Sequence, residues 1–129
     1  MAMKTEVRGG IAFDVELVRS GLATGEMKVT EAMLNPFGTV HAGALVWFAD
    51  VVATVLAIGE RDLAGPGGKG FPLAINLNAQ LLSNRRDGVI LAKAAFVKEG
   101  RRVSTVRTEV TDEAGKVLLE LTSTHILSE

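Results

Sequence analysis

The sequence has no cysteine and only two histidines, His41 and His125, among its 129 residues. Because zinc sites in proteins are built mainly from cysteine and histidine, this scarcity argues against one, and we expect no bound metal. Lys and Arg (14) nearly balance Asp and Glu (15), so no overall field favours nucleic acid or an anionic membrane as a partner. No basic and then apolar signal segment opens the chain, and we expect a cytoplasmic enzyme or binding protein.

Two common functional motifs are also missing. No G-x-S-x-G nucleophile elbow occurs, so serine-hydrolase chemistry has no support. The glycine-rich run over residues 65–70 does not form a phosphate-binding loop, because Lys69 is followed by Gly70 rather than Ser or Thr. We interpret residues 60–70 as a flexible connector and the only long loop of the chain.

The most informative stretch is an apolar segment over residues 42–58, whose single charge is Asp50. It predicts a helix that is hydrophobic on nearly every face and therefore buried on nearly every face. The segment is too short, and too polar at its midpoint, for a membrane span of ~20 residues. A buried carboxylate is costly, so Asp50 needs a reason to be there. It is either a functional acid or a structural acid satisfied by Thr54 or a neighbouring backbone group.

Alternating and turn-forming residues place six strands around this helix, in the order β-β-α-β-β-β-β. We interpret residues 1–10 as a flexible lead and residues 11–129 as a single domain. The strands are expected over residues 11–19, 22–30, 73–81, 89–98, 101–111 and 116–127, and the helix from His41 or Ala42 to Gly59. In the third strand, one face should carry Leu73, Ile75, Leu77, Ala79 and Leu81, and the other Asn76, Asn78 and Gln80.

Short turns between these strands indicate antiparallel pairing, which predicts an α+β layer pair of one helix and one sheet. One flat sheet cannot cover a helix that is apolar all round, so the sheet must curl about it. The side that stays uncovered must meet another surface, most economically an identical subunit across a two-fold axis.

The entry to the helix carries a recognisable pattern. The residues Asn35, Gly38, Thr39, His41 and Gly43, followed by Asp50 inside the helix, resemble the signature of hotdog-fold acyl-CoA thioesterases of the phenylacetic-acid-degradation type. The resemblance covers the chain from about residue 35 to the C-terminus. It implies a hotdog fold, a homodimer or dimer of dimers, and hydrolysis of acyl-CoA thioesters. Coenzyme A is then part of the substrate, and no separate cofactor is expected.

The spacing of the candidate groups along the helix limits which of them can act on the same substrate carbonyl. A thioester hydrolase needs a base or nucleophile and an oxyanion donor, both within ~3 Å of the reacting carbonyl group. The backbone N–H groups of Ala42 and Gly43 are unpaired at the positive end of the helix and can serve as the donor. Asp50 lies ~12 Å further along the axis, so one helix cannot supply both groups. Two antiparallel helices across a dimer axis can.

The resemblance also suggests roles for individual residues. Asn35 would orient substrate or water, and Asp50 would attack directly or activate water. His41 would orient the turn before the helix. His125 is interpreted as a surface or core residue without a catalytic role.

The chain departs from the family at three positions. Ala42 replaces a glycine, Ala74 stands where many relatives have Ser or Thr beside the acid, and Asn76 stands where Asp is common. The base would therefore lack its usual hydroxyl helper, and another residue could hold the water. A non-catalytic acyl-CoA binding protein stays an alternative, and a hotdog dehydratase is a weaker one, because the fold hosts all three.

Two features of the sequence bear on the substrate. Lys98, Arg101 and Arg102 flank one turn, where they are either a solvated tip or the contacts for the phosphates of coenzyme A. Arg85 and Arg86, at the preceding turn, form a second candidate pair. The aromatic side chains near the entry to the helix favour apolar or aromatic acyl groups; they are Phe37, Trp47 and Phe48.

Overall fold

We analysed a computed structural model, which describes residues 5–61, 63 and 69–128. Much of the predicted 60–70 connector lies outside the described residues. The elements confirm the order β-β-α-β-β-β-β, with a short 3-10 helix that the sequence did not predict. They are β1 (Asp14–Arg19), β2 (Leu22–Lys28), the 3-10 helix η1 (Glu31–Met33), α1 (Ala42–Ile58), β3 (Pro72–Leu81), β4 (Val89–Lys98), β5 (Val103–Thr111) and β6 (Val117–Leu127).

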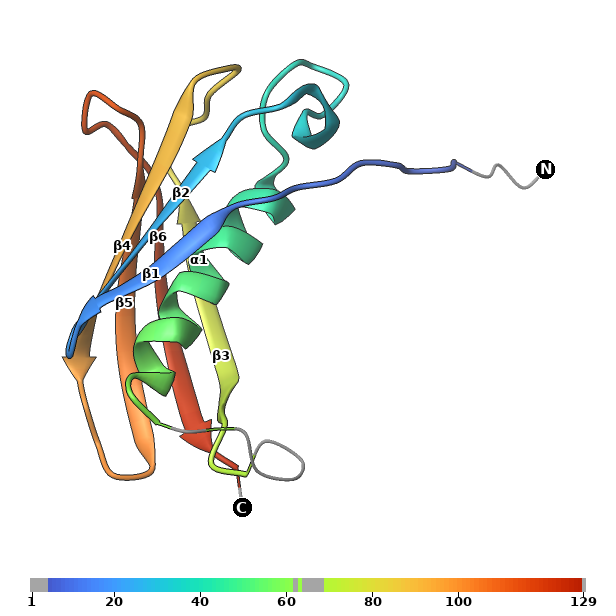
Figure 1. The fold of residues 1–129 in the computed structure, drawn as a ribbon. Helices are drawn as coiled ribbons and strands as arrows, with labels where there is room; N and C mark the ends of the chain where they lie inside the picture. The colour runs from blue at the N-terminus through green and yellow to red at the C-terminus, as the bar shows by residue number, and fades with distance from the viewer. Residues whose placement is uncertain (1–4, 62, 64–68, 129) are drawn as a thin grey trace.

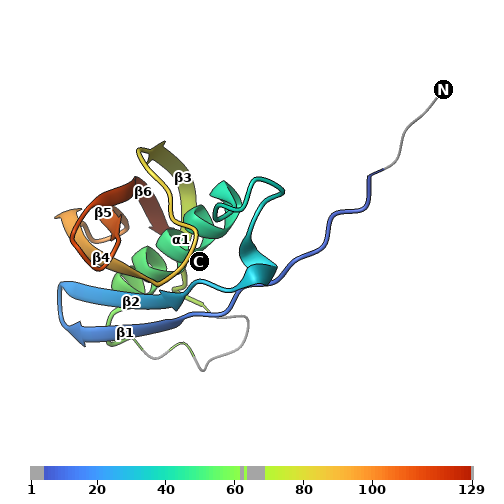
Figure 2. The same ribbon diagram turned by 90° about the horizontal axis from the view of Figure 1, so that it is seen from above.

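The strands form one six-stranded antiparallel sheet in the order β1-β2-β4-β5-β6-β3. The sheet curls around α1, which lies along its concave face (Figure 1). Seen from above, the helix sits inside the curl with β1 and β3 at the two edges (Figure 2). The predicted architecture, one long helix wrapped by a curved sheet, is confirmed.

The core lies between α1 and the inner face of the sheet, and Gly25 on β2 allows the two layers to approach closely. A Cβ atom at Gly25 would lie 2.7 Å from side-chain carbons of both Phe48 and Val52. Phe48 and Val52 are fully buried. The glycine that interrupts the second strand therefore makes room for the helix.

One side of α1 remains uncovered. We call this side, formed by Gly43, Trp47, Asp50, Thr54 and Ile58, the open stripe; its members recur every three or four residues, and each is partly or fully exposed. Trp47 is 51% exposed. A single chain thus fails to bury the helix on every face.

The edge strand β3 also leaves apolar side chains in solvent. Leu73, Ile75 and Leu77 are 48%, 58% and 45% exposed, respectively. Within the described sheet β3 pairs only with β6, so its outer edge has unpaired backbone groups. An exposed apolar edge of this kind is a template for pairing with another strand.

The prediction that β3 keeps one apolar face is wrong at its start. Ala74 pairs with His125 and Asn76 pairs with Thr124, so Ile75 is an extra residue that forms a bulge. A bulge shifts the alternation by one position. Ala74 and Leu77 therefore both face α1, whereas Leu73 lies on the opposite face of the sheet.

Two strands begin two or three residues later than the sequence predicts, and β6 begins one residue later. β1 begins at Asp14, although Ile11 and Phe13 still pack against the core. β5 begins at Val103, because the two preceding arginines belong to the turn. Residues 5–13 have no regular structure, and the N–H of Gly10 donates to the Ala32 carbonyl at 3.1 Å. The division into a lead and a domain stays a prediction.

Candidate active site

Asp50 lies in the middle of α1, on the open stripe, and is half-buried. Its Oδ1 atom is buried and has no hydrogen-bond partner among the described residues. The alternative of a structural acid satisfied by Thr54 or by backbone does not hold for this atom. Burial raises the pKa of the Asp50 carboxyl above its ordinary value, and the nearby His125 partly offsets the increase. Asp50 is therefore an acid with a raised proton affinity and an unused acceptor.

His125 lies on β6 with its side chain buried on the inner face of the sheet. Its Nε2 is 2.9 Å from the Ser123 hydroxyl oxygen, and its Nδ1 makes no hydrogen bond of acceptable geometry within the described chain. Burial lowers the pKa of the His125 ring, while the Pro72 carbonyl and Asp50 partly counter that effect. The charges of His125 and Asp50 therefore influence each other.

His125 lies in the core, one of the two expected positions, but its electrostatic interaction with Asp50 was not predicted from the sequence. The sequence does show the alternation of side chains along β6. His125 shares one face of this strand with Leu119, Leu121 and Ser123, and that face points to α1. Sequence periodicity shows that His125 points inward, but it does not show which residue of α1 it meets.

The start of α1 presents unpaired donors, as predicted. The His41 carbonyl accepts from the N–H groups of Ala44 and Leu45 at 3.0 and 3.2 Å, respectively. Ala42 and Gly43 are exposed, and neither N–H group has a hydrogen-bond partner among the described residues. Because these groups lie at the positive end of the helix, they can bind a developing negative charge.

The loop before the helix is shaped by Asn35. Its Oδ1 accepts from the backbone N–H groups of Phe37 and Thr39 at 2.9 and 3.2 Å, and its Nδ2 donates to the Thr39 hydroxyl at 2.8 Å. One amide hydrogen of Asn35 remains for another partner. The backbone N–H of His41 donates to the Met33 carbonyl at 3.0 Å, which fixes the point where the helix begins. The Asn35 side chain thus organises the loop that leads to the N–H donors.

The turn between β3 and β4 supports the same loop. Asn84 Nδ2 donates to the Val40 carbonyl at 2.8 Å, and the Val40 N–H donates to the Arg85 carbonyl at 3.1 Å. Arg86 Nη1 donates to the Phe37 carbonyl at 3.1 Å. The second pair of candidate cations therefore lies beside the start of α1.

The first group of candidate cations lies at the other end of the molecule. Lys98, Arg101 and Arg102 surround the turn between β4 and β5, at the end where α1 stops (Figure 1). Arg85 of the second group is partly engaged already, since it pairs with Asp87 at 3.2 Å and lies 3.8 Å from Asp112. The two groups of cations thus lie near opposite ends of the helix.

Two candidate residues of β3 lie on different faces of the sheet. Ala74 is paired with His125 and faces α1, whereas Asn76 is paired with Thr124 and faces outward. Within one chain, Asp50 is ~12 Å along the helix axis from Ala42, so the fold does not bring the acid to the N–H donors. The predicted site is therefore only partly assembled in a single chain.

A cavity of about 400 Å³ lies beside the unpaired donors. Its walls include His41, Gly43, Trp47, Met33 and residues 7–11. The Phe13 ring packs edge-on against Trp47 with a centroid distance of 5.1 Å. Of the three aromatic residues expected to contact an acyl group, only Trp47 lines this cavity. Phe48 is fully buried in the core and Phe37 is 82% exposed in the loop.

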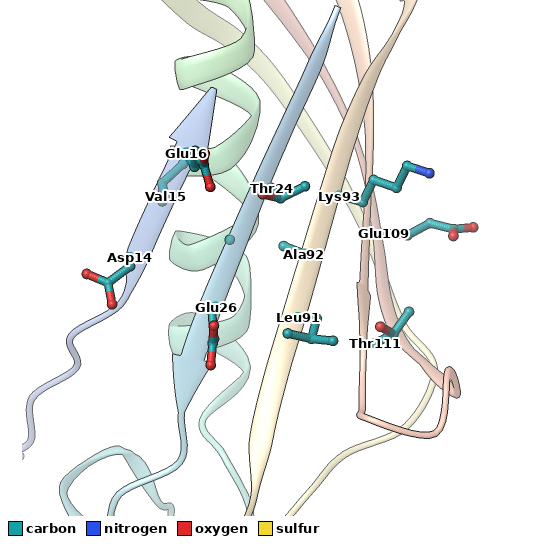
Figure 3. A pocket seen from close by; sticks show the side chains of 11 residues that line it. Asp14, Val15, Glu16, Thr24, Glu26, Leu91, Ala92, Lys93, Glu109 and Thr111 are labelled. Carbon is teal, nitrogen blue, oxygen red and sulfur yellow. The ribbon is translucent and has the colours of Figure 1, made fainter. Parts of the chain in front are cut away.

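A second hollow, of about 500 Å³, lies on the outer face of the sheet over β1, β2, β4 and β5. Carboxylates from β1, β2 and β5 line it together with Lys93 (Figure 3). The sheet separates this hollow from Asp50, and its negative charge would repel an anionic ligand. The carboxylates are Asp14, Glu16, Glu26 and Glu109.

No metal centre or membrane-spanning helix occurs in the part of the chain that the structure describes. No group of three or more His, Asp or Glu residues there is arranged to hold a metal ion. No helix of that part is long and apolar enough to cross a bilayer.

Comparisons with known proteins agree with this fold. A model of the thioesterase superfamily matches residues 37–119. A 1,4-dihydroxy-2-naphthoyl-CoA hydrolase of Listeria monocytogenes is 31% identical over 108 residues, which cover 84% of this chain and 84% of that protein.

Solved structures are similar over most of their length. A phenylacetic acid degradation-related protein of Ralstonia eutropha is 25% identical, with a TM-score of 0.77 over 89% of this chain and 84% of that one. A hypothetical thioesterase protein of Streptococcus pneumoniae, solved with coenzyme A, is 20% identical, with a TM-score of 0.77 over 91% of this chain and 86% of that one. The second likeness concerns the fold alone.

Proposed function

Because the chain belongs to the thioesterase superfamily and has the hotdog fold of its structural neighbours, we propose that it hydrolyses acyl-CoA thioesters to a free acid and coenzyme A. The observation that carries this proposal is the buried Oδ1 of Asp50, which has no hydrogen-bond partner among the described residues. A buried acceptor without a partner is costly, and a catalytic role is one explanation for it. Coenzyme A belongs to the substrate, and no other cofactor is needed.

The complete site requires two copies of the chain. The open stripe of α1 and the edge strand β3 carry exposed apolar side chains that a second copy would bury. With the two helices antiparallel across a two-fold axis, Asp50 of one chain faces the start of α1 in the other. Ala42 and Gly43 of that second chain then supply the oxyanion donors. A homodimer is the smallest active unit under this proposal, and two dimers could associate further.

The chemistry follows from the properties of the two groups. Asp50, whose pKa is raised by burial, accepts a proton from water as the water oxygen attacks the thioester carbonyl carbon. The carbonyl electron pair moves to oxygen, and the resulting oxyanion accepts hydrogen bonds from the N–H groups of Ala42 and Gly43. When the carbon–sulfur bond breaks, the thiolate of coenzyme A takes the proton back from Asp50. Asn35 holds the loop that positions the donors, and its remaining amide hydrogen can orient substrate.

The cavity beside Gly43 is the place for the acyl group. Trp47, Met33 and Ile11 make its lining largely apolar, which suits an apolar or aromatic acyl chain. The Listeria relative is named for an aromatic acyl-CoA, and this supports the same class here. The phosphates of coenzyme A would bind either to Lys98, Arg101 and Arg102 or to the arginines of the preceding turn, Arg85 and Arg86.

Release of free thiol from a panel of aliphatic and aromatic acyl-CoAs tests this function. We expect turnover of at least one aromatic or apolar member, and its loss in Asp50→Asn. Ala74, which brings no hydroxyl to the inner face, favours the alternative of an acyl-CoA binding protein without turnover. Saturable binding of acyl-CoA with no thiol release across the panel would support that alternative.

A further inference from the structure

The peptide group that joins Val40 to His41 is held at both of its polar atoms. Its carbonyl oxygen accepts from Nδ2 of Asn84 at 2.8 Å, and its N–H donates to the Met33 carbonyl at 3.0 Å. The next peptide group of the chain carries the N–H of Ala42, the first of the two unpaired donors. Because peptide groups are planar and only two bonds rotate between neighbours, the held peptide fixes the direction in which α1 begins.

Asn84 reaches this peptide from a distant part of the chain. It belongs to the turn between β3 and β4, 44 residues after Val40. The Asn84 Oδ1 accepts from the N–H of Arg85 at 2.7 Å, which orients the amide so that Nδ2 donates to the Val40 carbonyl. The Val40 N–H in turn donates to the Arg85 carbonyl at 3.1 Å. The turn thus binds both backbone polar groups of Val40.

Water cannot replace the Asn84 amide at this position. Val40 is 0% exposed, and apart from Asn84 no described residue donates a hydrogen bond to its carbonyl. Loss of the donor would leave a buried acceptor without a partner, which is unfavourable. The peptide could regain a partner by turning its carbonyl toward solvent. Such a rotation would also redirect the N–H groups of Ala42 and Gly43.

We propose that Asn84 is a positioning residue for hydrolysis: by holding the Val40 carbonyl, it keeps the N–H groups of Ala42 and Gly43 aimed at the oxyanion. The inference rests on the proposed thioester hydrolysis, in which these two groups bind the charge that develops on the carbonyl oxygen. Asn84 acts through the backbone and has no contact of its own with the reacting atoms.

Steady-state kinetics of Asn84→Asp test this role. The variant has the same shape and keeps the acceptor for the Arg85 N–H, but at neutral pH it has no hydrogen to donate to Val40. It should lower kcat about ten- to hundredfold, because a small displacement of the oxyanion donors is costly in the transition state. KM should stay close to the wild-type value, since the oxyanion exists only in the transition state.

Asn78→Asp is a matched control for the change of charge. Asn78 lies exposed on the outer face of β3, where its Oδ1 accepts from Nε2 of Gln80 at 3.3 Å. The substitution keeps that acceptor and adds the same charge, but it leaves the loop before α1 untouched. Its kcat and KM should both equal those of the wild type.

Crystal structures test the geometry without relying on activity. Compared with the wild type, Asn84→Asp should show the Val40 carbonyl turned away from position 84 and the N–H groups of Ala42 and Gly43 redirected. Melting temperatures identify a variant that does not fold. Asn84→Ala, which removes the donor without adding a charge, then takes its place in both experiments, with the same expected results.

Three results would overturn the inference: wild-type kcat in the folded position-84 variant, a backbone over residues 40–43 that superimposes on the wild type, or an equal loss of kcat in Asn78→Asp. A wild-type protein that releases no thiol from any acyl-CoA would instead contradict the proposed function. The crystal structures would still show whether Asn84 holds the N–H donors in that case, so the two failures are distinguishable.

Discussion

Asp50 is the residue on which the proposed chemistry depends most. It places a carboxyl in a helix that is otherwise uncharged, where burial raises its pKa and leaves Oδ1 without a partner among the described residues. These properties suit a general base, which needs a proton affinity above that of an ordinary carboxylate and a lone pair that no other hydrogen bond occupies.

Replacement of Asp50 by Asn should reduce acyl-CoA hydrolysis by ~10² or more, because the amide cannot accept the proton. The fold should survive, since the side chain keeps its size. The variant should be at least as stable as the wild type at neutral pH, because burial disfavours the ionised acid that it replaces. Thiol release and thermal melting of the same preparation measure both effects, and wild-type turnover in the folded variant would exclude Asp50 as the base.

The pH dependence follows from the direction of the Asp50 pKa shift. A base works only when deprotonated, so the acidic limb of kcat/KM should have its midpoint above the ordinary carboxyl pKa of 3.8. The same shift affects stability: a raised folded-state pKa adds stability below the unfolded pKa, and this contribution is lost as pH rises through the folded pKa. The stability difference between wild type and Asp50→Asn should therefore grow in favour of the variant as pH rises. An acidic limb of kcat/KM with its midpoint at or below pH 3.8 would contradict the raised pKa of Asp50.

At the scale of elements, the central relation is the close approach of α1 to β2. It depends on Gly25, where a Cβ atom would lie 2.7 Å from carbons of both Phe48 and Val52. The buried face of α1 is thereby set against the sheet, which leaves the open stripe, with Asp50 on it, on the uncovered side.

Gly25→Ala should destabilise the protein by ~1–3 kcal/mol, because the new methyl overpacks a closely packed core. The expected measurement is a lower midpoint in denaturant unfolding with an unchanged slope. Gly10→Ala is a matched control, since nothing lies within 4 Å of the position of its Cβ atom. Equal stability of the two variants would mean that α1 can move away from β2 without a loss of stability.

The two turns that carry cations make separate predictions, because they lie at opposite ends of α1. Charge reversal at Arg101 and Arg102 should raise KM for acyl-CoA strongly, and should affect a short pantetheine thioester less, since only the full substrate carries the distal phosphate. Steady-state kinetics with both substrates measure the difference. Equal losses for the two substrates would place the phosphate contacts elsewhere, and Arg86, beside the Asn35 loop, is then the next position to reverse.

At the scale of the whole molecule, the single chain is incomplete in two respects. Its helix keeps the open stripe uncovered, and its acid lies ~12 Å along the helix axis from the N–H donors at the start of the same helix. A second copy of the chain, with its helix antiparallel to the first, would cover the stripe and would bring its own Asp50 to the N–H donors. The dimer is thus required by the proposed chemistry as well as favoured by the burial of apolar surface.

Subunit mixing tests the shared site directly. An Asp50→Asn chain and an Asn35→Ala chain should each be inactive, the first without a base and the second without an ordered donor loop. Heterodimers of the two should regain part of the activity, because one of their two composite sites has both groups intact. Exchange after mild denaturation, with thiol release assayed on purified heterodimers, measures the gain. Heterodimers as inactive as either parent would show that Asp50 and Asn35 act within one chain.

Local signals in the sequence were sufficient for the order of the helix and the strands, and for their bounds to within three residues. Strand alternation, turn residues and a long uncharged run are properties of neighbouring residues, so α1 was predicted to within a residue, and Asp50 stood out as its only charge. The pattern before the helix indicated the family, which the comparisons confirm. The predicted site residues themselves stay a proposal that rests on these signals.

Only the tertiary structure decided which distant residues meet. His125 and Asp50, which are far apart in the chain, influence each other's charge because β6 belongs to the sheet that curls around α1. Because of the bulge at Ile75, Ala74 faces the helix. A one-residue shift of this kind cannot be recognised from the sequence of an apolar strand. Sequence periodicity specifies which way each side chain points. What lies opposite it depends on strand register and sheet curvature, which the packing of the whole chain determines.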